Sequence, residues 1–100
     1  MTCRQATATG GFLSGTDLYR YCTAITQPYE TGACEGYILG VMDRFEASRE
    51  NAHLRHCTHS GMTGEQVKDV VFKYLTDNPQ IRGQPAWALV TEAIMKAWCK

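Results

Sequence analysis

The residues most able to do chemistry lie close together between positions 53 and 59. This stretch holds His53, His56, Cys57 and His59. Imidazole and thiolate are ligands that zinc prefers, and a histidine beside a cysteine can activate a thiolate nucleophile. The spacing is poor for zinc, because His56 and Cys57 are adjacent and no distant second ligand pair stands out. A metal-binding domain is therefore an alternative and not the main interpretation.

The carboxylates give weaker indications of chemistry. Asp43 and Glu46 lie three apart on the outer side of an expected helix, where such residues usually keep a surface soluble. Asp69 and Lys73 have the spacing of a weak surface ion pair. No glycine-rich phosphate loop and no Ser-His-Asp arrangement stands out. We therefore expect a binding domain, with no enzymatic activity and no cofactor.

Five cysteines in 100 residues indicate disulfide bonds and an oxidising compartment. We expect Cys22, Cys34, Cys57 and Cys99 to form two intrachain disulfides. Cys3 then has no intrachain disulfide partner and no assigned role. A bonded Cys57 is neither a nucleophile nor a zinc ligand, because both roles need a thiolate.

The overall composition restricts the partners and the compartment. Ten Lys and Arg balance ten Asp and Glu without a basic run, so nucleic-acid binding has no support. No signal peptide or membrane-spanning run is present. We expect the mature form of an exported protein, with Met1 supplied for expression. Residues 1–11 are small and polar, which predicts a flexible tract before a single domain at 12–100.

The central element is a helix whose apolar side chains recur every three or four residues along 34–45. Its inner stripe consists of Cys34, Tyr37, Ile38, Val41, Met42 and Phe45. We expect this helix to run from about Gly32 to Ser48, after a break at 26–32. Gly36 and Gly40 lie beside the stripe, which predicts close approach of a second backbone, either inside the fold or in a dimer.

A first helix is expected before residue 26. Ser14 or Thr16 can act as its N-cap, and Asp17 suits the positive start of a helix. Its expected inner residues are Leu18, Tyr21, Cys22 and Ile25.

Two further helices are expected after residue 61. One begins at a capping box of Thr63 and Gln66, with Met62 packing on Val67, and ends at 77–79. The other has Pro85 at its first position. Their expected inner residues are Val67, Val70, Val71, Tyr74, Leu75, Ala86, Leu89, Val90, Ala93, Ile94 and Ala97. Short connections favour antiparallel neighbours, so the sequence predicts an all-α, compact bundle of about four helices.

The helix order favours one disulfide pairing. In the simplest up-and-down arrangement, the first helix ends beside the start of the second, and the second and fourth helices end near each other. This arrangement favours Cys22–Cys34 and Cys57–Cys99. Four cysteines allow three pairings, and the sequence leaves the other two open.

The order of particular residues resembles one known family over about 12–99. The blocks that carry the resemblance are Gly15-x-x-Leu18-x-x-x-Cys22, Cys34-Glu35-Gly36-Tyr37-Ile38-Leu39-Gly40-Val41-Met42-Asp43, Thr63-x-x-Gln66-Val67-x-x-Val70-Val71-x-x-Tyr74-Leu75-x-x-x-Pro79 and Pro85-Ala86-x-x-Leu89-Val90-x-x-Ala93-Ile94-x-x-Ala97-Trp98-Cys99. The chain resembles the Tai/Rap family of type VI secretion amidase immunity proteins, specifically the group that neutralises the fourth class of Tae peptidoglycan amidases.

The resemblance implies a small helical periplasmic protein that binds a cysteine-dependent peptidoglycan amidase and occludes its active site. It also implies a homodimer that meets two effector molecules, with a protruding loop that enters the cleft of the enzyme. A second hypothesis is a small periplasmic chaperone or stress protein, whose three histidines loosen their loop when they are charged.

The contact residues are expected on the exposed connections. The segment 49–60 is the longest expected loop, and it is polar and anchored at Cys57. The first candidates for effector binding are Arg49, Glu50, His53, Arg55 and His56. The second set, in the turn at 77–84, consists of Asn78, Gln80 and Arg82. For either segment the alternative is an ordinary solvated connection.

Overall fold

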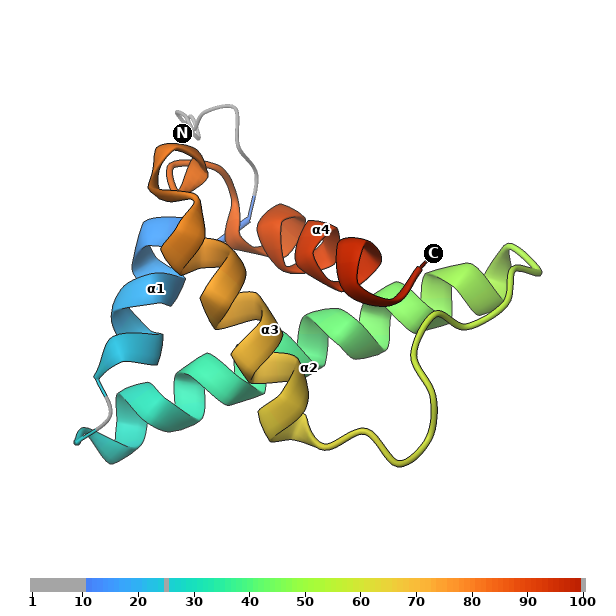
Figure 1. Ribbon diagram of the computed structural model, residues 1–100, viewed down its shortest axis with the longest axis horizontal. Helices are drawn as coiled ribbons and strands as arrows, with labels where there is room; N and C mark the ends of the chain where they lie inside the picture. The colour runs from blue at the N-terminus through green and yellow to red at the C-terminus, as the bar shows by residue number, and fades with distance from the viewer. Residues whose placement is uncertain (1–10, 25, 100) are drawn as a thin grey trace, which may run out of the picture.

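The structure is a computed structural model that describes residues 11–24 and 26–99, and Figure 1 shows how its helices are arranged. Its helices are α1 (Gly15–Thr23), α2 (Pro28–Asn51), α3 (Gly64–Asp77), the short 3-10 helix η1 (Pro79–Ile81) and α4 (Ala86–Trp98). The predicted all-α fold of about four helices is confirmed. The predicted tract at 1–11 and the inner position of Ile25 fall outside the described residues, except for Gly11.

The long helix α2 is the element on which the others pack. Its 24 residues span about 36 Å at a rise of ~1.5 Å each, close to the longest dimension of the molecule, 37 Å. All three other α-helices contact α2; α3 crosses it, and α4 lies along its C-terminal half (Figure 1). Within the two described ranges, no helix has the combined length and hydropathy of a membrane span.

The predicted start of the central helix near Gly32 is wrong, because α2 begins at Pro28. Proline fits the first helical position, where its missing N–H has no partner to lose and its fixed φ is already helical. The residue before it, Gln27, is extended as an N-cap. A side chain at Gly32 would meet nothing within 4 Å, so this glycine costs some helix propensity but breaks no packing.

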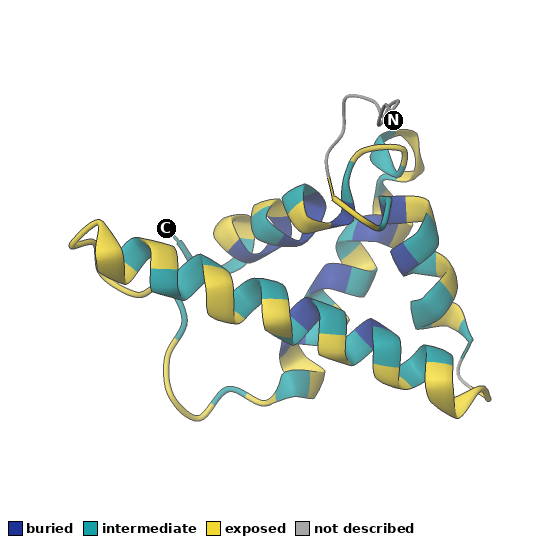
Figure 2. Ribbon diagram, turned by 180° about the vertical axis from the view of Figure 1, so that it is seen from behind, coloured by how far each residue is buried: buried dark blue, intermediate teal, exposed yellow. Residues whose placement is uncertain are grey.

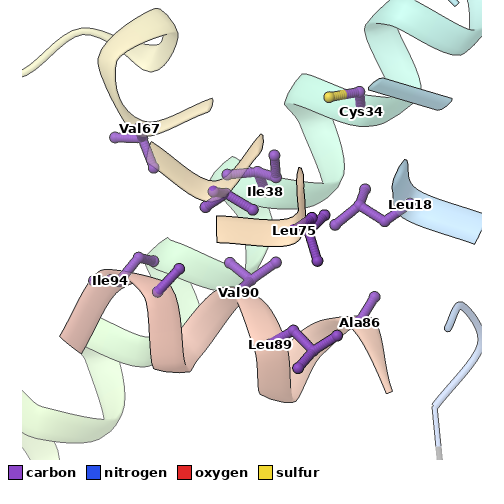
Figure 3. Packing of buried hydrophobic residues seen from close by; sticks show 11 residues of the cluster. Leu18, Cys34, Ile38, Val67, Leu75, Ala86, Leu89, Val90 and Ile94 are labelled. Atoms are coloured by element: carbon purple, nitrogen blue, oxygen red, sulfur yellow. The ribbon is translucent and has the colours of Figure 1, made fainter. Parts of the chain in front are cut away.

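The hydrophobic core lies where the four helices meet. Figure 3 shows Ile38, Leu75 and Val90 facing one another from α2, α3 and α4. The buried apolar residues are Leu18, Cys34, Ile38, Val67, Val71, Leu75, Ala86, Leu89, Val90, Ala93 and Ile94. Burying each leucine or isoleucine stabilises the fold by roughly 1.5–3 kcal/mol. The predicted stripe of α2 is buried only at Cys34 and Ile38, and its remaining members are half-buried.

The start of α1 is fastened to the chain that precedes α4. Ser14 is the N-cap, and its hydroxyl accepts a hydrogen bond from Asp17 N at 3.1 Å. Hydrogen bonding from the Ser14 backbone is the main cause that lowers the pKa of Asp17. Gly15 N donates to Gln84 O at 2.8 Å. A Cβ on Gly15 would lie 2.8 Å from Arg82 O, so this close approach requires glycine.

The starts of α3 and α4 follow different rules. The predicted capping box at Thr63 and Gln66 is confirmed. Pro85, predicted at the first helical position, is instead the extended N-cap of α4, with ψ 138°.

The ion pair predicted between Asp69 and Lys73 is also wrong, because Lys73 Nζ lies 2.9 Å from Asp77 Oδ2.

Both favoured disulfides are present. Cys22–Cys34 joins α1 to α2 with a Cα–Cα distance of 5.0 Å. Cys57–Cys99 joins the chain before α3 to the end of α4, with a Cα–Cα distance of 4.8 Å. The second bridge matters most for the candidate site, because it fixes an irregular segment to a helix.

Candidate functional site

The connection between α2 and α3 spans 52–63, and we refer to it as the interhelix loop. It follows a Schellman motif, in which His53 N donates to Glu50 O at 3.0 Å and Leu54 N donates to Arg49 O at 2.8 Å. His53 has φ 62°, a left-handed conformation that glycine usually occupies at this position. The boundary predicted at Arg49 is therefore wrong, because Arg49 and Glu50 belong to the last turn of α2.

One carboxylate on α2 holds the middle of the interhelix loop. Glu46 accepts hydrogen bonds from Cys57 N at 3.1 Å and from Thr58 N at 2.8 Å, and also binds the Thr58 hydroxyl. Burial alone would raise the pKa of Glu46, but the hydrogen bonds from Thr58 and Cys57 outweigh it and lower the pKa. The sequence interpretation of Glu46 as a solubilising surface residue is wrong, because it has this structural role.

A concave surface, which we call the loop groove, lies between the interhelix loop and the end of α4. Its volume is about 730 Å³. Its lining residues are Arg49, His53, Leu54, Arg55, His56, Cys57, Met95, Trp98 and Cys99. Four of the five first-choice contact residues therefore share one surface. The fifth, Glu50, lies beside it, with its Oε2 3.7 Å from His56 Nε2.

Arg49 is held in position at the edge of the loop groove. Its Nε donates to Arg55 O at 2.6 Å. Its guanidinium carbon also lies 5.8 Å from the centre of the Phe45 ring. By contrast, the side chains of His53 and Arg55 are exposed, and Figure 2 shows the exposed character of this end of the molecule.

The structure argues against Cys57 as a metal ligand or as a nucleophile. Cys57 is bonded to Cys99, so its sulfur is not a thiolate. His59 Nδ1 lies 3.0 Å from the backbone oxygen of Ser60. Among residues 11–24 and 26–99, no three His, Cys, Asp or Glu side chains gather in a metal-binding arrangement.

In the second set of predicted contact residues, Arg82 and Asn78 bind carbonyl groups at the end of α3. Arg82 Nε donates to Leu75 O at 2.7 Å, and its guanidinium carbon lies 3.8 Å from the centre of the Tyr19 ring. Asn78 Nδ2 donates to Tyr74 O at 2.8 Å. Gln80 Nε2 lies 3.5 Å from Asn78 Oδ1. Figure 1 places this turn far from the interhelix loop, so the structure does not bring the two sets together.

Sequence reasoning did not identify a second concavity, which we call the apolar groove. It lies between α2 and α4 and has a volume of about 630 Å³. Its lining residues are Gly36, Tyr37, Gly40, Val41, Arg44, Phe45, Ser48, Trp87 and Thr91. The interpretation of its glycines as internal packing sites is wrong, because a Cβ on Gly36 or Gly40 would meet nothing within 4 Å. The four-residue spacing of Gly36 and Gly40 was the signal available in the sequence, whereas only the structure shows Trp87 beside them with 48% of its surface exposed.

The comparisons with known proteins agree with the resemblance at the level of the family. The model of a protein family described as the Rap1a immunity proteins matches residues 14–99. Searches of curated proteins and of solved structures gave no match. The matched residues contain all four α-helices and both disulfides. The chain therefore belongs to the Rap1a immunity protein family.

Proposed function

We propose that this protein binds a type VI-secreted peptidoglycan amidase in the periplasm and occludes its active site, which protects the producing cell from its own toxin. The observation that carries the proposal is the family match over 14–99, because an immunity family implies a partner effector. Two disulfides support an oxidising compartment such as the periplasm. The amidase and the secretion system come from the resemblance described above.

The interhelix loop is the proposed plug. The Glu46 carboxylate and the Cys57–Cys99 disulfide hold it from outside, so its shape exists before binding. A preformed loop loses less conformational entropy when it binds, which favours affinity. Steric obstruction of this kind needs no cofactor and no turnover.

Co-purification with the effector tests this function. A candidate Tae-type amidase is co-expressed in a catalytically inactive form and captured through an affinity tag. We expect the two proteins to elute together, and we expect His53→Ala to weaken the complex. A matched variant, His59→Ala, changes a histidine of the same loop that does not line the loop groove. Separate elution of the wild-type proteins at micromolar concentration would contradict the proposal.

The apolar groove is our proposed surface for the homodimer. Gly36 and Gly40 leave room for a second backbone, and the resemblance implies a second copy. We expect Gly40→Leu to shift the protein to a monomer in light scattering. Gly32→Leu is the matched control, since Gly32 is equally open on the same helix but does not line the groove. An unchanged dimer in the Gly40 variant would remove this surface from consideration.

The second candidate function, a small chaperone, is favoured by the same apolar groove. The proposed acid trigger has less support, because His56 Nε2 lies 3.7 Å from Glu50 Oε2 and a charged His56 would strengthen this contact. An acid titration with an environment-sensitive dye distinguishes the two functions. Dye binding that rises on acidification would favour the chaperone, and unchanged binding would count against it.

A further inference from the structure

The loop groove is positively charged within a chain of zero formal net charge. Two arginines and two histidines line it, and none of its described lining residues carries a carboxylate. Two carboxylates lie near the groove: Glu46 binds the loop backbone, and Glu50, whose side chain is 73% exposed, has its Oε2 3.7 Å from His56 Nε2. Among the described residues, a carboxylate therefore lies beside His56, whereas Arg49 and Arg55 have none within ion-pair distance.

Two guanidinium groups in the groove have donors to offer. Arg55 makes no side-chain hydrogen bond or ion pair with any residue of 11–24 and 26–99. Arg49 uses Nε on Arg55 O, which leaves its terminal nitrogens free to donate. Because that bond and the Phe45 ring already hold Arg49, little side-chain freedom remains to be lost on binding. A guanidinium fork matches the two oxygens of a carboxylate.

The remaining walls of the groove are apolar. Leu54 comes from the interhelix loop and is 53% exposed, while Met95 comes from α4 and is 45% exposed. Trp98 lies beside them and is half-buried. Such exposed apolar side chains next to arginines suit a protein segment with an acidic residue beside an apolar one. A phosphate backbone would use the cationic donors but leave the apolar walls unfilled.

We infer that the loop groove binds an acidic side chain of the effector, with an adjacent apolar side chain packed against Leu54, Met95 and Trp98. The identity of the partner rests on the proposed function. In this mode of recognition, Arg55 and Arg49 pair with an aspartate or glutamate that the effector presents to the loop.

Charge reversal at Arg55 tests the inference with the same candidate amidase as the partner. We expect Arg55→Glu to raise the Kd at least tenfold in calorimetry, and Arg55→Lys to raise it less, because it keeps the charge but loses the fork. Arg20→Glu is the matched control, since Arg20 is an exposed arginine that lines neither groove. Equal affinity of the wild type and Arg55→Glu would overturn the inference and leave the proposed function standing. No binding by the wild type would instead contradict the proposed function.

A peptide titration tests the inference without the effector. The probes are acetyl-Gly-Glu-Leu-Glu-Gly-amide and the same peptide with glutamine in place of glutamate, followed by NMR of the whole protein. We expect saturable shifts at the Arg55 side chain and the His53 ring, at least fivefold tighter for the glutamate peptide, and lost in Arg55→Gln. Equal binding of both peptides, or equal displacement by inorganic phosphate at the same concentration, would overturn the inference.

Discussion

The interhelix loop and the turn that contains Arg82 look alike in sequence but differ in where their hydrogen bonds go. Both are polar connections between helices. In the turn, Arg82 donates to carbonyl groups at the end of α3, and Asn78 does the same. In the interhelix loop, the fastening groups come from outside, from Glu46 on α2 and Cys99 after α4. The loop therefore keeps the side chains of Arg55 and His53 available to a partner.

A polar connection can serve as a binding site only where its side chains are not already bonded to the fold. A long charged side chain such as Arg82 can complete a helix end, because the last carbonyls of a helix lack partners within it. The side chain of the arginine at position 55 makes no hydrogen bond or ion pair with the described residues, so its guanidinium can bind another molecule. Four measurements test this difference, and they follow in order of expected effect.

The largest effect is expected from removing the disulfide that fastens the interhelix loop. Replacing both Cys57 and Cys99 by Ser should lower the free energy of unfolding by about 4 kcal/mol, because the bridge closes a long segment of chain; its sequence separation is 42. Replacing Cys22 and Cys34, with a separation of 12, should cost about 3 kcal/mol. Urea titrations measure both. A loss below about 1 kcal/mol in the first variant would mean that the bridge does not restrain the loop.

The next effect concerns Arg82 in the turn. Arg82→Ala should lower the free energy of unfolding by roughly 2–3 kcal/mol, because it leaves carbonyls of α3 without a donor and removes the contact with Tyr19. Its affinity for the effector should not change while it is folded. Arg20→Ala is the matched control, since its exposed pair with Asp17 contributes at most about 1 kcal/mol. Normal stability with lost binding would place the turn in the interface.

A smaller loss of stability is expected from replacing Glu46, which holds the backbone of the interhelix loop. Because the pKa of Glu46 is lowered in the folded protein, its contribution is present above its ordinary pKa of 4.5 and is lost as the pH falls through the folded pKa. Glu46→Gln should cost about 1 kcal/mol at pH 7 and reduce the dependence of stability on acid. Asp43→Asn, on the same helix, should leave stability within about 0.5 kcal/mol. Identical acid profiles for wild type and Glu46→Gln would contradict the anchoring role.

The smallest effect is a gain in stability at His53. With φ 62°, this residue occupies a conformation that glycine adopts without steric cost. His53→Gly should therefore raise the free energy of unfolding by roughly 0.5–1 kcal/mol while it weakens effector binding. Thermal melting and calorimetry measure the two properties. A less stable variant with full affinity would show that the imidazole serves the fold and not the interface.

The sequence predicted those parts of the fold that depend on neighbouring residues. The capping box at Thr63 is local, and the disulfide partners followed from the order of the helices. Pro28 was misjudged because proline suits both a break and a first turn, and the chain that follows decides between them. The roles of Glu46 and Arg82 could not be predicted, because each depends on a partner that only the fold brings near. The arginines and histidines of the loop groove were predicted as contact residues, but its shape and its apolar walls of Leu54, Met95 and Trp98 were not.

Inhibition of the candidate amidase on purified peptidoglycan tests the central claim most directly. Release of soluble muropeptides is followed while this protein is added in increasing amounts. The account predicts that hydrolysis falls in proportion and stops once each amidase molecule has one protein molecule. Undiminished hydrolysis with this protein in tenfold excess, or hydrolysis by this protein alone, would contradict it.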